Sequence, residues 1–386
     1  MTPAARISAA IEILDQMNDG LAAEQALTRW SRNSRFAGSK DRAAVRDHVF
    51  DVLRQRRSVA HFGGAETGRG LMLGLLRTQN VDPDEFFTGI AHAPAPLADY
   101  ERAYLPETAA PDVAWDLQDW LIPDFEASLG PQARDTALAL QHRAPICLRI
   151  NTAKTDSSAA QLSLIEDGVE TVPNPTAPHA LSITGGPRRL RASRAYLAGE
   201  VELQDAASQS VVAELPPGAR VLDYCAGGGG KSLALAMAPN RTVFAHDIDP
   251  RRMSDLDTRA ERAGANITQL ATQSLADHAP FDLVLCDAPC SGSGSWRRAA
   301  EAKWTLTPAR LTEIQGIQDT ILEAASALVS ADGILAYVTC SVFQVENEAR
   351  IDAFLARHPE WVCTYQRRYT IDENGDGFFA AHLTRS

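Results

Sequence analysis

The chain has 386 residues, with 37 basic and 49 acidic side chains and a formal net charge of −12. Its 45% of hydrophobic and 22% of charged residues are typical of a globular protein and exclude collagen-like, disulfide-stapled and long disordered chains. At about 100–200 residues per domain, we expect two or three domains. The acidic balance excludes binding of nucleic acid through bulk charge, so any such binding must use local basic patches.

The six cysteines show neither a disulfide framework nor the paired CxxC pattern of a zinc ribbon. We therefore expect free thiols in a reducing compartment and no metal. The N-terminal segment carries Glu12 and Asp15, so it lacks the apolar core of a signal peptide. Since no apolar run reaches the ~18 residues of a membrane span, we expect a cytoplasmic protein without a membrane partner, and a monomer.

The first third of the chain has the periodicity of helices. Between residues 6 and 126, apolar side chains recur at three- and four-residue steps, as at Ile7, Ile11 and Leu14. Strand-like alternation is absent, and glycine and proline pairs mark the loops. We predict an all-helical N-terminal domain over residues 1–140.

Residues 141–210 predict a small α+β subdomain. A helix is expected over Ser157–Glu166, with strands over residues 146–150, 169–172 and 181–184. The segment ends in a cluster of four arginines, Arg188, Arg189, Arg191 and Arg194.

Strands and helices alternate over residues 211–386. We expect strands over residues 221–224, 242–245, 281–286 and 333–339, and helices over residues 231–237, over residues 250–263 and from Thr307-Pro308 onward. Threonine suits an N-cap and proline suits the first position of a helix. The alternation predicts an α/β fold with a doubly wound, mostly parallel sheet.

One predicted strand runs directly into four glycines and a helix, as R-V-L-D-Y-C-A-G-G-G-G-K-S over residues 220–232. The loop lacks a glycine that the P-loop requires and one that the dinucleotide fingerprint requires. The spacing of Asp223, Gly227 and Gly229 suits S-adenosylmethionine, because its sulfonium and amino group favour a nearby carboxylate. Asp247 ends the next strand, where it can bind both ribose hydroxyls. A tight turn without a ligand is the alternative.

Two cysteines follow predicted strands at the edge of the sheet where ligands bind. Cys290 lies in D-A-P-C-S-G-S-G and Cys340 in T-C-S, beside small or polar residues. A thiolate next to a methyl donor indicates methylation of pyrimidine C5, because addition of the thiolate at C6 makes C5 nucleophilic. Asp287 can hydrogen-bond the base. The alternative, a small core side chain, fits the other buried-type cysteines better, namely Cys147, Cys286 and Cys363.

These segments resemble the RsmB/Nop family of RNA cytosine-C5 methyltransferases over most of the chain. The matching motifs are Q-D-A-A-S at 204–208, V-L-D-Y-C-A-G-G-G-G-K at 221–231, D-A-P-C-S-G-S-G at 287–294, Y-V-T-C-S-V at 337–342, E-N-E at 346–348 and G-D-G-F-F at 375–379. The helical front end, with Asp41-Arg42-Ala43 and Leu53-Arg54, is similar to the NusB-like RNA-binding domain of the bacterial rRNA enzymes.

The resemblance implies a Rossmann-like methyltransferase domain over residues 211–386 that uses S-adenosylmethionine. It implies that Cys340 is the nucleophile, that Cys290 assists product release and that Asp287 lies near the cofactor and the target base. The residues expected to bind the cofactor are Cys225, Ala226, Gly227, Gly228, Gly229, Gly230, Lys231, Asp247, Thr272 and Asp287.

Two positions depart from the family pattern. The family loop usually reads C-A-A-P-G-G-K, and here Gly227 and Gly228 replace alanine and proline, at an entropic cost of order 1 kcal/mol per residue. The family also tends to place an acid near the end of the third strand, to contact adenine. Residues 271–273 contain no acid, and we expect Thr272, or alternatively Gln273, to hydrogen-bond the adenine amino group.

RNA is the expected partner, and small-subunit rRNA is the expected substrate. Transfer RNA, and a non-catalytic RNA-binding factor of ribosome assembly, are alternatives. Phosphate contacts by arginine and lysine would position the RNA, and the target base would leave its stack to reach the sheet edge. The residues expected to contact RNA are Arg188, Arg189, Arg191, Arg194, Arg297, Arg298 and Lys303.

Overall fold

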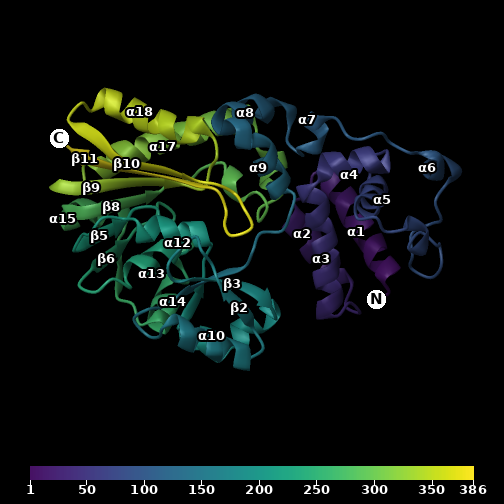
Figure 1. The fold of residues 1–386 in the computed structure, drawn as a ribbon, viewed down its shortest axis with the longest axis horizontal. Helices are drawn as coiled ribbons and strands as arrows, with labels where there is room; N and C mark the ends of the chain where they lie inside the picture. Colours follow the sequence, from purple (N-terminus) through teal and green to yellow (C-terminus); the bar gives the residue numbers. More distant parts are fainter. The chain divides into compact units, whose positions relative to one another are not determined.

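The computed structural model describes residues 1–386, which form two compact units (Figure 1). The first, called the helical unit, comprises residues 1–126, 130–143 and 296–305. The second, called the sheet unit, comprises residues 127–129, 144–295 and 306–386. None of the helices combines the length and the apolar character that crossing a membrane would require.

The helical unit confirms the helical N-terminal region. Thr2 caps its first helix by accepting the N–H of Ala5, and Pro3 takes the first helical position. The helix that contains Val59 and the helix that contains Gly74 cross closely. A Cβ on Gly74 would lie 1.7 Å from the carbonyl oxygen of Val59, so only glycine fits there. The helices are α1 (Pro3–Asn18), α2 (Ala23–Asn33), α3 (Ser39–Arg54), α4 (Arg56–Gly63), α5 (Gly68–Thr78), α6 (Asp99–Ala103), α7 (Pro111–Ala114), α8 (Ile122–Leu129), α9 (Ala133–Leu140) and α16 (Ala302–Thr305).

Residues 296–305 belong to the helical unit, although the sequence analysis placed them inside the methyltransferase domain. The reason is the C-terminus of α3, whose last carbonyl groups have no partner within the helix. Lys303 Nζ donates to the carbonyl of Arg54 at 2.9 Å, and Trp304 Nε1 donates to the carbonyl of Leu53 at 2.7 Å. The segment therefore completes both the end of α3 and the core of this unit.

Part of the sheet unit is a four-stranded antiparallel sheet with the strand order β2-β3-β1-β4. Its strands are β1 (Cys147–Ile150), β2 (Glu170–Pro173), β3 (Ala180–Gly185) and β4 (Val201–Leu203), and its helices are α10 (Ser157–Glu166) and α11 (Arg194–Leu197). Asp156 caps α10 by accepting the N–H of Ala159. The predicted helix and three strands are confirmed, and β4 is an addition.

The larger sheet has seven strands in the order β10-β11-β9-β8-β5-β6-β7. They are β5 (Arg220–Asp223), β6 (Thr242–Ala245), β7 (Ile267–Gln269), β8 (Phe281–Asp287), β9 (Val329–Thr339), β10 (Trp361–Tyr369) and β11 (Phe378–Arg385). The strands from β9 to β7 are parallel, whereas β10 and β11 form an antiparallel hairpin on β9. The mostly parallel, Rossmann-like fold is thus confirmed, and β7 and the hairpin are additions.

Helices cover both faces of this sheet (Figure 1). One face carries α12 (Ala206–Ala213), α13 (Gly230–Leu235) and α14 (Leu256–Ala263), and the other carries α17 (Pro308–Ser326) and α18 (Glu348–Arg357); α15 (Leu275–His278) precedes β8. The single helix expected over residues 250–263 is wrong. Asp249 accepts the N–H of Arg251 and starts a separate 3₁₀ turn over Pro250–Met253, and α14 begins only at Leu256.

The charge of Lys303 couples the stability of the helical unit to pH. Burial lowers the pKa of Lys303 to about 8, so between pH 8 and pH 10.5 the unfolded chain binds more protons than the folded chain. The free energy of unfolding should therefore rise through this window, by up to about 3 kcal/mol. Urea denaturation at pH 8 and pH 10 measures the rise. Lys303→Met should remove it, and an equal rise in both proteins would contradict the expectation.

Candidate active site

The site forms where four parallel strands end. Asp223 ends β5, Asp247 follows β6, Asp287 ends β8 and Cys340 follows β9. Because β8 lies between β5 and β9, and β6 pairs with β5 on its other side, these ends share one edge of the sheet. The sheet thereby gathers the predicted catalytic residues with most of the predicted cofactor residues.

Two thiols face each other at this edge. The Sγ atoms of Cys290 and Cys340 are 3.5 Å apart, and both cysteines are free. The hydrogen bond from Cys290 lowers the pKa of Cys340, although burial opposes that shift. The same hydrogen bond, together with burial, raises the pKa of Cys290. Cys340 is therefore the more acidic thiol of the pair, and Cys290 holds its proton more tightly.

A buried ion pair lies beside the thiols. Lys231 Nζ is 2.6 Å from Asp287 Oδ2, and its side chain is 9% exposed. Burial alone would lower the pKa of Lys231, but the Asp287 carboxylate outweighs burial and raises it. The charged ammonium also lowers the pKa of Cys340. The Asp287 side chain is one-third exposed, at 33%, so part of its carboxylate remains accessible to a ligand.

The glycine loop is held by side chains. Gly227 and Gly229 adopt positive φ angles of 52° and 77°, the left-handed conformation that favours glycine. The N–H of Gly227 donates to Asp247 Oδ2 at 2.9 Å, and the guanidinium of Arg259 donates to the carbonyl of Gly228. These contacts order the loop despite the loss of the family's alanine and proline.

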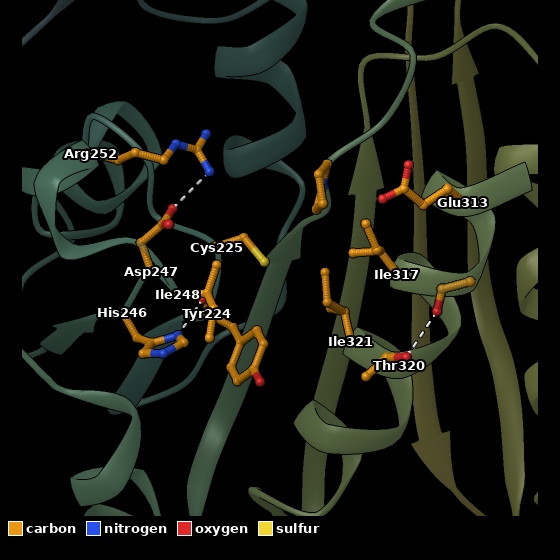
Figure 2. A pocket seen from close by; sticks show the side chains of 12 residues that line it. Tyr224, Cys225, His246, Asp247, Ile248, Arg252, Glu313, Ile317, Thr320 and Ile321 are labelled. Carbon is orange, nitrogen blue, oxygen red and sulfur yellow. Dashed lines mark hydrogen bonds and ion pairs between the residues drawn. The ribbon is translucent and has the colours of Figure 1, made fainter. Parts of the chain in front are cut away.

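A cavity of about 370 Å³ lies next to the loop (Figure 2). One wall comes from α17, with Ile317 and Ile321, and the opposite wall includes Ile248 and Asp247. Arg252 Nη1 lies 3.1 Å from the buried Asp247 carboxylate. The cavity therefore combines apolar walls, which suit a purine base, with a carboxylate, which suits ribose hydroxyls.

Asp223 adds a second carboxylate, one residue before the cavity-lining Tyr224. Its Oδ2 accepts the hydroxyl of Ser232 at 2.6 Å, whereas its buried Oδ1 has no hydrogen-bond partner. Burial raises the pKa of Asp223 to about 7. A buried acceptor without a partner is costly, and the amino group of S-adenosylmethionine would satisfy it. The residues present thus fit this cofactor.

Thr272 reaches the cavity only through another residue. Its hydroxyl lies 2.9 Å from Nε2 of His246, which lines the cavity, and the other ring nitrogen of His246 lies 2.7 Å from the carbonyl of Tyr224. The role of Thr272 toward adenine stays a prediction. No group of three or more His, Cys, Asp or Glu side chains is arranged to hold a metal ion.

The predicted RNA contacts divide into two groups. Arg188, Arg189, Arg191, Arg194 and Arg298 are exposed, and Arg194 pairs with two neighbouring carboxylates. The structure corrects the other two.

Arg297 and Lys303 are only 3% and 1% exposed. The Arg297 carbonyl accepts a hydrogen bond from Arg54 Nε, and Lys303 completes α3. Their sequence pattern is the same as that of surface charges, because nothing in it marks the segment as internal to the helical unit. Their burial does not fit the expected role of surface contacts to phosphate.

Some residues of the site went unrecognised in the sequence. Ile317 and Ile321 belong to an apolar stripe on α17, and both line the cavity, although Ile321 also packs against the hydrophobic core. The small and polar residues near Ile317 on this helix, Gly316 and Thr320, could have indicated that this part of the stripe is not fully buried in the core. Glu346 received no role, although it is completely buried beside both cysteine loops.

Removing the charge of Asp247 should weaken binding of the cofactor. Asp247→Asn keeps the side-chain volume but loses a charged acceptor, and we expect the Kd for S-adenosylhomocysteine to rise about tenfold or more. Titration calorimetry measures it. Asp249→Asn is the matched control, because Asp249 pairs with Arg251, outside the cavity. Equal affinities of the Asp247→Asn variant and the wild type would contradict the assignment.

The two thiols should differ in reactivity. At pH 7.5 we expect iodoacetamide to modify Cys340 before Cys290, because only the thiolate attacks. Mass spectrometry of the peptides follows each site in time. Cys225 and Cys363 are internal controls, since burial raises the pKa of both thiols. Faster alkylation of Cys290 than of Cys340 would refute the assigned proton position.

Comparison with known proteins gives a consistent result. A family model described as 16S rRNA methyltransferase RsmB/F matches residues 211–384, and one described as the ferredoxin-like domain of RsmF/B-like methyltransferases matches residues 118–188. Ribosomal RNA small subunit methyltransferase B of Xylella fastidiosa is 32% identical over an alignment of 395 positions, which covers 90% of each chain. Its Salmonella arizonae namesake is 32% identical over 302 residues, which cover 74% of this chain and 70% of that one.

A solved structure agrees with the fold. The methyltransferase homolog protein from Pyrococcus horikoshii matches with a TM-score of 0.62 and 25% identity, over 72% of this chain and 98% of that one. Together with the identity to the two curated relatives over most of the chain, these matches show that the protein belongs to the RsmB/F family of 16S rRNA methyltransferases.

Proposed function

We propose that this S-adenosylmethionine-dependent rRNA methyltransferase modifies C5 of a cytosine in small-subunit rRNA through a covalent adduct between Cys340 and C6 of the base. The observation that carries the proposal is the pair of facing cysteines, Cys290 and Cys340, with their sulfur atoms 3.5 Å apart beside the Lys231–Asp287 ion pair. The cofactor, when bound, supplies an electrophilic methyl group. Relatives named ribosomal RNA small subunit methyltransferase B support rRNA as the substrate.

Cys340 begins the reaction. Its thiolate electron pair forms the S–C6 bond. The C5=C6 electron pair then lies on C5, delocalised toward C4 and N3, and makes C5 nucleophilic. Asp287 has one oxygen bonded to Lys231 and part of its carboxylate exposed, so it can accept a hydrogen bond from the base edge near N4. Lys231 and Cys290 stabilise the thiolate until it adds.

Cys290 completes the reaction. Once Cys340 is bonded to carbon, its negative charge no longer raises the pKa of Cys290, which can release its proton to solvent. The Cys290 thiolate then takes the C5 proton, the C5=C6 bond re-forms and the S–C6 electron pair returns to Cys340. The net product is one proton per methyl group transferred, and the thiolate–thiol pair is restored.

Single-cysteine variants test both roles. The substrate is undermethylated small-subunit rRNA with labelled cofactor, and nucleoside analysis identifies 5-methylcytosine. We expect label at C5 with wild type, none with Cys340→Ala, and a covalent protein–RNA adduct on denaturing gels with Cys290→Ala. Cys363→Ala is the control, since Cys363 lies on β10, away from the site, and it should keep full activity. Methyl transfer by Cys340→Ala would refute the nucleophile.

Transfer RNA run in parallel separates the alternatives. Methylation of tRNA but not of rRNA would replace the substrate and keep the mechanism. Binding of either RNA without methyl transfer by the wild type would favour a non-catalytic assembly factor and overturn the catalytic proposal.

A further inference from the structure

Glu346 is a buried carboxylate that the mechanism above does not use. It ends the 3₁₀ turn Gln344–Glu346, six residues after Cys340, and its exposed fraction is 0%. A buried carboxylate is costly unless donors surround it, so the identity of its donors shows what it is placed to hold.

The donors come from both cysteine-bearing loops. Next to Cys290, Ser291 donates its N–H to Oε1 at 2.7 Å and its hydroxyl to Oε2 at 2.5 Å. Next to Cys340, the hydroxyl of Ser341 donates to the same Oε2 at 2.5 Å. Both loops are therefore bonded to one carboxylate, each through the residue that follows its cysteine.

Further contacts support this arrangement. Gln318 on α17 donates through Nε2 to Glu346 Oε1 at 3.3 Å and to the carbonyl of Pro289, which precedes Cys290, at 3.0 Å. The N–H of Gly294 donates to the carbonyl of Cys340 at 2.9 Å. The relative position of the two loops, and with it the distance between the sulfur atoms, is set by these bonds.

The charges around the thiols are arranged asymmetrically. The groups that act on Cys340 are Lys231, which lowers its pKa, and Asp287, which raises it. Glu346 acts on Cys290 and raises its pKa. The Lys231 cation thus favours the ionised form of Cys340, and the Glu346 anion favours the protonated form of Cys290.

We propose that Glu346 is a positioning residue for the methyl transfer: it fixes the two cysteine loops against each other and keeps the shared proton on Cys290. This proposal rests on the proposed function only for its consequence in catalysis, since the position of the proton exists without RNA or cofactor.

Glu346→Gln tests the charge. Glutamine keeps the size and an acceptor oxygen, and the matched control Glu348→Gln removes a charge two residues away that pairs with Arg368. The readout is the pH profile of iodoacetamide alkylation at each cysteine of the full chain. In Glu346→Gln we expect the Cys290 profile to move about one pH unit lower, so that the preference for Cys340 at pH 7.5 falls about tenfold. Glu348→Gln should match the wild type.

A change in stability alone would not support the proposal. If Glu346→Gln lowers Tm but leaves both alkylation profiles unchanged, the residue is only structural and the proposal is overturned. Should Glu346→Gln not fold, Ser291→Ala removes one donor and leaves the carboxylate in place. The Cys290 loop is then held less firmly against Cys340, whose hydrogen bond raises the pKa of Cys290, so the Cys290 profile should shift lower, but by less than in Glu346→Gln. An unchanged profile would again overturn the proposal.

The turnover assay separates the two proposals. With rRNA, we expect Glu346→Gln to lower kcat about tenfold or more, because the two cysteine loops lose their shared acceptor, while KM for the cofactor stays unchanged. If the wild type forms no 5-methylcytosine, the proposed function fails, but the alkylation profiles still test the position of the proton. If the wild type is active and Glu346→Gln keeps full kcat, only the role of Glu346 in catalysis is refuted.

Discussion

One proton shared by two half-buried sulfur atoms is the interaction on which the rest of the site depends. A thiolate in a desolvated place is unfavourable, and a neighbouring thiol is a donor that fits only when both sulfurs are held close together. Parallel pairing of β8 with β9, in which Asp287 lies opposite Val338, brings the two strand ends to the same level. After these strands, the hydroxyls of Ser291 and Ser341 both donate to the Glu346 carboxylate. The sheet therefore brings the two cysteine loops near each other, and the carboxylate fixes the distance between them.

The cofactor side follows the same logic of buried charge. Asp223, Asp247 and Asp287 lie at three strand ends, and each has a different partner: a serine hydroxyl, a backbone N–H and a lysine. Of the three, only Asp223 keeps a buried oxygen with no hydrogen-bond partner. One hydrogen bond is therefore missing, at the Asp223 oxygen next to the cavity. A ligand that donates a hydrogen bond there gains the most binding free energy.

Sequence patterns predicted the parts of the fold in which local chemistry and tertiary structure agree. Thr307 and Pro308 begin α17 as their capping preferences require, and the glycine loop joins β5 to α13. The hairpin of β10 and β11 was missed. Its first strand has an irregular burial pattern and a register shift near Cys363, so the expected alternation is weak.

The candidate site was predicted to a similar extent. The strand-end carboxylates and both cysteines follow from spacing, because parallel strands place their ends together. The proton position and the role of Glu346 do not, because they depend on side-chain contacts between segments about fifty residues apart. Arg297 and Lys303 were misplaced for the same reason, since a basic residue that completes a helix end has the same sequence signature as one that faces solvent.

Residues 296–305 also bear on how such a protein could arise. The chain leaves the sheet unit after Ser295, contributes Ala300 and Trp304 to the hydrophobic core of the helical unit, and returns at Leu306. Along the sequence, segments of the two units therefore alternate, and one unit does not simply follow the other. A recombination event that exchanged residues 1–126 as a block would leave the ten-residue segment 296–305 packed against helices with which it did not evolve. The two units must therefore diversify together. In a chimaera, compensating substitutions are expected in this segment.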